Sequence, residues 1–193
     1  AGGQTVHESM AFEALYLATT LAQLLPDEPE APGLAALLAL SLARLPARGA
    51  PDEYVPLDEQ DATLWDAALI AEGEHLLRRA HALGRPGRFQ LEAAIQSAHC
   101  SGKPDARVLR KLYGALVAVA PTLGARAGLA ATIARVEGPA AGLAELDAMK
   151  NEAVQRFQPW WATRAHLLAE AGLHEAAAQA YDKAISLTTE VGV

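Results

Sequence analysis

Apolar residues recur at helical spacing along most of the chain, and proline or glycine separates one run from the next. The first run ends at Pro26 and contains Phe12, Leu15, Ala18, Leu21 and Leu25. The second is nearly all alanine and leucine, and a helix that is apolar on most sides has to be enclosed by other helices. The pattern predicts about nine helices, over residues 8–25, 32–45, 61–83, 88–99, 107–119, 124–136, 139–150, 159–170 and 173–188.

The longest interruption is residues 46–60, which hold three prolines and several acidic side chains. Overall, 51% of the residues are apolar but only 5% are aromatic, so alanine and leucine dominate the apolar content. These are strong helix formers, whereas sheets favour β-branched and aromatic residues. We therefore predict an all-α protein that forms a single domain over residues 1–193, with a loop insertion at about 46–60.

The last helices carry the residue pattern of a tetratricopeptide repeat (TPR), whose period is about 34 residues. Its six characteristic positions are filled by Trp161, Ala165, Gly172, Ala177, Tyr181 and Ala184. One period earlier the small and turn positions are Ala131 and Gly138, and two periods earlier they are Ser97 and Pro104. The spacing predicts antiparallel helix pairs stacked as a TPR-like helical repeat array, whose concave surface would bind a peptide or another domain.

Charge and cysteine content narrow the class of protein. The net charge is −7, and basic residues are dense only at Arg78–Arg79, Arg85–Arg88 and Arg107–Lys111, which disfavours a nucleic-acid surface. The single cysteine, Cys100, excludes an intramolecular disulfide and suits a reducing compartment. No apolar run reaches the ~18 residues of a membrane span, and the opening AGGQTVHES does not resemble a signal peptide. We expect a cytoplasmic protein.

Few patterns point to chemistry. Glu72 and His75 have the Glu-x-x-His spacing of di-iron bundles, but the second such pair that those sites need is missing. His99 and Cys100 are adjacent, and adjacent side chains on a helix point about 100° apart, so they do not converge on one atom. The GRPG segment at 84–87 lacks the lysine and Ser/Thr of a phosphate loop and fits a helix end followed by a turn. We expect no enzyme activity, no cofactor and no metal site.

Four segments in order resemble a known family. They are LLPDEPE (24–30), DEQDATLWDAALIAEG (58–73), LGRPGRFQLEAAIQSAH (83–99) and EGPAAGLAELDAM (137–149). Together they resemble the helical, TPR-like C-terminal extension of one group of bacterial extracytoplasmic-function (ECF) sigma factors. The chain departs from that family at Ala62, where relatives usually carry arginine, and at AGLAAT (127–132), where they tend to carry an LNRAVA-like run.

This resemblance implies a regulatory interaction domain that modulates promoter-directed transcription initiation by RNA polymerase. Sigma domains 2 and 4 are absent from the chain, which begins about where such an extension leaves the second sigma domain and stops before the arginine-rich last helix of relatives. The implied partners are the sigma-factor core domains, RNA polymerase or both. Direct contact with nucleic acid is not expected from this region.

The helices around residues 61–73 and 87–99 are the predicted functional face, because they carry polar residues within the most family-like sequence. The candidate interaction residues are Asp61, Trp65, Glu72, Arg85, Gln90, His99 and Trp160. Each polar member could equally cap a helix or support the fold, and of Trp160 and Trp161 one is expected in the core and the other as an exposed anchor. Two alternatives stay open: a free-standing TPR-like adaptor that binds peptides, and a small-molecule sensor with a dry pocket near Trp65 and Phe89.

Overall fold

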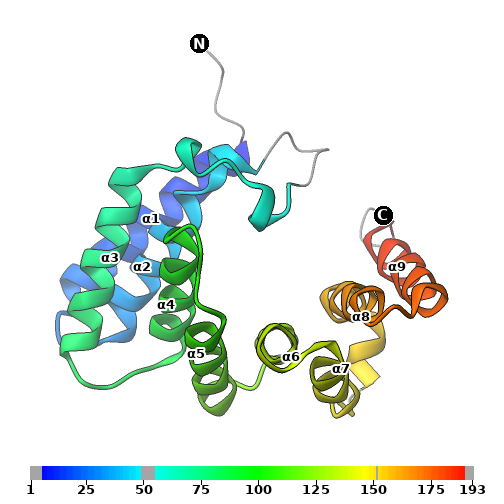
Figure 1. Ribbon diagram of the computed structural model, residues 1–193. Coiled ribbons are helices and arrows are strands. Elements are labelled where there is room, and N and C mark those ends of the chain that lie inside the picture. The colour runs from blue at the N-terminus through cyan, green and yellow to red at the C-terminus, as the bar shows by residue number, and fades with distance from the viewer. Residues whose placement is uncertain (1–5, 49–54, 151, 190–193) are drawn as a thin grey trace. The chain divides into compact units, whose positions relative to one another are not determined.

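The computed structural model describes residues 6–48, 55–150 and 152–189, and within these ranges it contains α-helices and 3-10 helices but no β-strand (Figure 1). The α-helices are α1 (Val6–Leu24), α2 (Glu30–Leu42), α3 (Ala67–Ala82), α4 (Arg88–Cys100), α5 (Ala106–Val119), α6 (Leu123–Glu137), α7 (Pro139–Asp147), α8 (Gln158–Glu170) and α9 (His174–Thr189). Four 3-10 helices are η1 (Leu45–Ala47), η2 (Leu57–Glu59), η3 (Ala62–Leu64) and η4 (Glu152–Arg156). The predicted all-α class and nine helices are confirmed over the described ranges.

The helices fall into two compact units, one of residues 1–104 and one of residues 105–193. We call them the N-terminal unit and the C-terminal unit. The single domain over residues 1–193 with an insertion at about 46–60 stays a prediction, and the boundary between the two units lies in the CSGKPD turn between α4 and α5. Residues 49–54 of that insertion lie outside the described part of the chain.

Helix α2 is the centre of the N-terminal unit and packs on α1, α3 and α4. Ala35, Ala36 and Leu40 are completely buried, which confirms the expectation that this alanine- and leucine-rich helix is enclosed by others. Small residues let the backbones approach closely. A Cβ atom on Gly73 of α3 would lie 2.6 Å from Leu40 Cγ, so glycine is needed where α3 crosses α2.

Two details of this unit differ from the sequence prediction. In α1 the buried face consists of small residues, Ala18 and Ala22, whereas Phe12 and Leu21 of the predicted apolar run are exposed. The third helix was predicted to begin at residue 61, but α3 begins at Ala67 because the Asp66 carboxylate accepts hydrogen bonds from the first backbone N–H groups, at 2.9 and 3.0 Å.

The C-terminal unit is a stack of helices in chain order, in which each of α5 to α8 packs on the next helix. Helices α8 and α9 form its tightest antiparallel pair and lie side by side in Figure 1. Ala165 and Ala177, two of the residues matched to the repeat pattern, are buried at this crossing. Gly172 between the helices has φ 77°, the left-handed conformation expected of a turn glycine. The pair is therefore a TPR-like helical hairpin.

Candidate functional site

Arg85 and Gln90 lie together in the N-terminal unit, around the carboxylate of Glu30. Glu30 Oε2 accepts the backbone N–H of Phe89 at 2.8 Å, and Oε1 accepts the backbone N–H of Gln90 at 3.2 Å. These are unpaired N–H groups of the first turn of α4, whose own N-cap residue, Gly87, offers no side chain. A carboxylate from the start of α2 thus caps α4 from about 60 positions away.

The side chains of Arg85 and Gln90 complete this cluster. Gln90 is buried, and its Nε2 donates to Glu30 Oε1 at 3.3 Å and to the carbonyl oxygen of Arg85 at 2.8 Å. Arg85 Nη2 donates to the carbonyl oxygen of Asp27 at 2.7 Å, across the turn between α1 and α2. The cluster joins segments 24–30 and 83–99, two of the four family-like segments. Gln90 therefore supports the fold and is not available to a partner, which corrects its prediction as a contact residue.

Trp65 and His99 meet in a separate cavity of about 70 Å³ at the other end of α4. Leu57, Gln60 and Pro104 also line it. Trp65 Nε1, a donor, and Gln60 Oε1, an acceptor, are buried without a hydrogen-bond partner. A buried water molecule can bridge a donor and an acceptor of this kind. Phe89 does not line this cavity, and ligand pockets usually have roughly 300–1,000 Å³. The volume fits water better than a metabolite.

Asp61 and Glu72 are both exposed. Asp61 is the N-cap of η3, where its carboxylate accepts the hydroxyl of Thr63 at 2.7 Å and the backbone N–H of Thr63 at 2.9 Å. These hydrogen bonds, the one from the hydroxyl first, lower the pKa of the Asp61 carboxyl. Glu72 stands on the solvent side of α3, and no group of three or more metal-ligating side chains is found among the described residues.

Trp160 is a core residue of the C-terminal unit, with only 7% of its surface exposed. Its Nε1 donates a hydrogen bond to the carbonyl oxygen of Leu146 at 3.3 Å. The Trp161 ring packs edge-on against the Trp160 ring, with the two ring centroids 4.9 Å apart. The Cζ atom of Arg164 lies over the Trp160 ring, 5.2 Å from the ring centroid. Trp160, a candidate interaction residue, is therefore the core member of the tryptophan pair, and Trp161 is half-buried. The seven candidate residues hence do not form one face.

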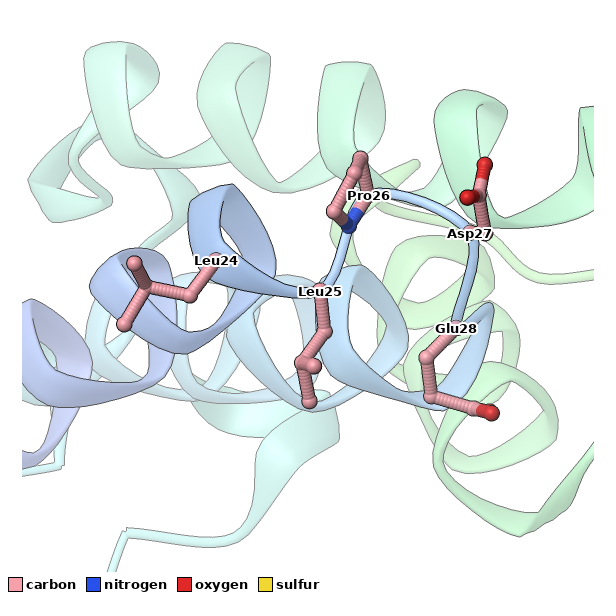
Figure 2. A pocket seen from close by; sticks show the side chains of 5 residues that line it. All are labelled: Leu24, Leu25, Pro26, Asp27 and Glu28. Atoms are coloured by element: carbon pink, nitrogen blue, oxygen red, sulfur yellow. The ribbon is translucent and has the colours of Figure 1, made fainter.

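Two surface features are absent from the predicted set. In the C-terminal unit Arg107, Arg110, Lys111 and Val136 surround a hollow of about 520 Å³, and Arg110 forms an ion pair with Glu137. In the N-terminal unit a hollow of about 340 Å³ lies at the end of α1, bounded by Leu24, Leu25, Pro26, Asp27 and Glu28 (Figure 2). The sequence did mark the basic residues 107–111 as dense, but not the apolar end of α1.

Comparisons with known proteins connect the chain to a family and to one longer protein. Residues 1–81 match a family described as a family of unknown function (DUF6596), and this stretch holds α1, α2 and nearly all of α3. An uncharacterized protein of Rhizobium meliloti (strain 1021) is 33% identical over an alignment of 193 residues that covers 97% of this chain and 45% of the relative. The chain thus spans a little less than half the length of that protein. No solved structure matches the chain significantly.

The length and apolar character of the helices were compared with what a membrane span requires. Over the described ranges, none of them combines the length and the apolar character that crossing a bilayer requires.

Proposed function

We propose that this chain is the regulatory protein-interaction region of an ECF-type sigma factor, which modulates promoter-directed transcription initiation by RNA polymerase. The observation that carries the proposal is the ordered set of four family-like segments, which runs through both units of the fold. In this role the chain binds proteins in the cytoplasm. It neither catalyses a reaction nor contacts DNA directly.

The fold supports a binding role. Helical pairs stacked in chain order, such as those of the C-terminal unit, present long surfaces that suit protein partners. The net charge of −7 complements the basic surfaces that DNA-binding sigma domains need. Gln90 hydrogen-bonds to Glu30 and to the carbonyl oxygen of Arg85, and all three residues lie inside family-like segments. Part of the family pattern therefore maintains the fold and leaves recognition to exposed residues.

The length of the relative is also compatible with a fused regulator. More than half of that protein lies outside its match to this chain. A protein of that build has room for two sigma domains beside a region of this size.

Retention of partners on the immobilised chain tests the proposal. Sigma domains 2 and 4 from the parent protein, and core RNA polymerase, are applied separately at moderate salt. Retention of the sigma domains identifies an intramolecular regulator, and retention of polymerase alone identifies an accessory docking region. If neither binds while both are active in transcription, the proposal fails, and the TPR-like hairpin of α8 and α9 then favours a free-standing peptide-binding adaptor.

A further inference from the structure

Helix α1 has a second apolar face that nothing in the described structure covers. Its inner face packs on α2 through Ala18 and Ala22, which are buried. On the outer side Met10, Leu17 and Leu24 are 62%, 58% and 73% exposed. Large apolar side chains are thus turned to solvent, and the small ones are turned to the core. Single exposed leucines are common, but a continuous row of them marks an interaction surface.

The row has the spacing of a helix-packing seam. Met10, Ala14, Leu17, Leu21 and Leu24 follow one another at alternating intervals of four and three residues. At about 100° per residue, these five positions fall within an arc of about 80° on the helix surface. A narrow stripe with this alternation is the pattern by which one helix packs against another with interlocking side chains. We call these five residues the outer seam.

The seam leads into the hollow at the end of α1. Leu24 belongs to both, and Leu25 and Pro26 give the hollow further apolar surface. In the view of Figure 2 the side chains of Leu25 and Glu28 point to the same side of the turn, while Asp27 points to the opposite side. An apolar side chain that lies against Leu25 in the hollow would therefore lie beside the Glu28 carboxylate.

The charged side chains of the segment that carries the seam are acidic. No lysine or arginine occurs between residues 6 and 28 of the sequence, whereas Glu13, Asp27 and Glu28 are exposed there. Arg85 reaches the turn, but its hydrogen bond ends on the backbone carbonyl of Asp27 and not on the carboxylate. A second copy of this chain would bring acidic groups against acidic groups, and an anionic membrane surface would be repelled likewise.

We propose that the outer seam and the hollow beyond it bind an amphipathic helix with basic flanks. The partner helix packs leucine-type side chains, spaced alternately by three and four residues, against Met10, Leu17, Leu21 and Leu24. Its lysine or arginine side chains pair with the Glu28 carboxylate beside the hollow. Resting on the proposed function, the inference assigns this helix to the sigma-factor core domains.

A synthetic helix tests the chemistry without assuming the partner. One labelled peptide carries leucines at the 3–4 spacing with lysines on both flanks, and a matched peptide carries glutamates on the same flanks. In fluorescence anisotropy with the whole chain, we expect the lysine peptide to bind at least about tenfold more tightly and to weaken with added salt, because the attraction between its flanks and the seam is screened.

Variants of the chain separate apolar packing from simple charge attraction. Leu17→Glu with Leu24→Glu adds negative charge to exposed positions, so charge attraction alone would strengthen binding of the lysine peptide. The seam predicts the reverse, a loss of at least about tenfold, since burial of a leucine contributes roughly that factor or more. Gln23→Glu adds one negative charge, half that of the double variant, on an exposed position of α1 away from the seam and is expected to change binding less than about twofold.

Three results would overturn the inference. The first is unchanged binding of the lysine peptide by the double variant while circular dichroism shows its helices intact. The second is a dimer in sedimentation that the double variant dissociates, because the seam would then hold a second copy. The third is equal retention of the sigma domains by the wild-type chain and the double variant; the proposed function would survive that result. If the seam binds the lysine peptide but the chain retains neither sigma domains nor polymerase, the seam stands and the proposed function fails.

Discussion

Removal of the Glu30 carboxylate tests how the N-terminal unit is held together. In Glu30→Ala the backbone N–H groups of Phe89 and Gln90 lose their acceptor, and the amide of Gln90 loses one of its two partners. Loss of a helix-capping side chain costs about 0.5–2 kcal/mol, and a partly buried anion at a helix N-terminus contributes up to ~2 kcal/mol. Since the two contributions overlap, we expect a loss of about 2 kcal/mol in the free energy of unfolding.

Such a loss is large enough to measure. For a unit of this size it lowers the melting temperature by roughly 8–16 °C. Urea and thermal unfolding followed by circular dichroism, fitted with a separate transition for each unit, give the free energy. Hydrogen exchange at the amides of Phe89 and Gln90 gives a local readout and is expected to accelerate. Glu72→Ala is the matched control, because this glutamate is exposed on α3, and its effect is expected to stay within about 0.5 kcal/mol.

A double-mutant cycle with Gly87 makes the reasoning refutable. A Cβ atom on Gly87 would lie 2.3 Å from Glu30 Cδ, so Gly87→Ala must displace the same carboxylate that Glu30→Ala removes. We expect the two changes to be non-additive by about 1 kcal/mol or more in the unfolding free energy. Additive effects, or a Glu30→Ala effect no larger than that of the Glu72→Ala control, would show that this carboxylate does not hold α2 to α4.

Two further outcomes follow from close packing and from burial. Gly142→Ala places a Cβ atom 2.7 Å from the carbonyl oxygen of Ala130, so we expect its free energy of unfolding in urea to fall by about 1–3 kcal/mol. Gly114→Ala has open space around it and should raise the free energy of unfolding by about 0.5–1 kcal/mol. A change of the same sign in both variants would contradict the packing. Burial raises the pKa of the Cys100 thiol, an effect that the charge of Arg44 partly offsets, so a thiol reagent at pH 8 should label the folded chain more slowly than the urea-unfolded chain. Because the pKa of the thiol is higher in the folded than in the unfolded chain, its contribution to stability is complete below the ordinary thiol pKa of 9.0 and is lost as the pH rises through the folded pKa. Equal labelling rates in the folded and unfolded chain would refute the shift in pKa.

The helices were largely predictable, since each one begins or ends at a local signal that the sequence displays. Gly138, with φ 98°, separates α6 from α7 where the sequence placed a boundary. The start of α3 was misjudged because both Asp61 and Asp66 have the character of an N-cap, and only the fold shows that Asp66 caps the long helix while Asp61 caps η3.

The candidate site was less predictable, because its contacts join distant parts of the chain. Nothing near Gln90 in the sequence indicates that its partner is Glu30, 60 positions earlier. For the same reason periodicity alone did not tell which apolar face of α1 meets the core. The larger residues suggested the buried side, but close approach to α2 selects alanine there and leaves Leu17 outside.

The turn glycines have a consequence for how a protein of this build changes length over evolution. Gly138 and Gly172 lie 34 positions apart, and both have a left-handed backbone with no neighbour in the space where a side chain would go. Glycine is thus needed at both turns for its positive φ and not for close packing against a neighbour. A chain segment that is duplicated or deleted between two such glycines keeps a complete turn at each end. Whole helical hairpins can therefore be gained or lost without changes to the turns that join them. Insertions of other lengths would disturb the register of every later crossing.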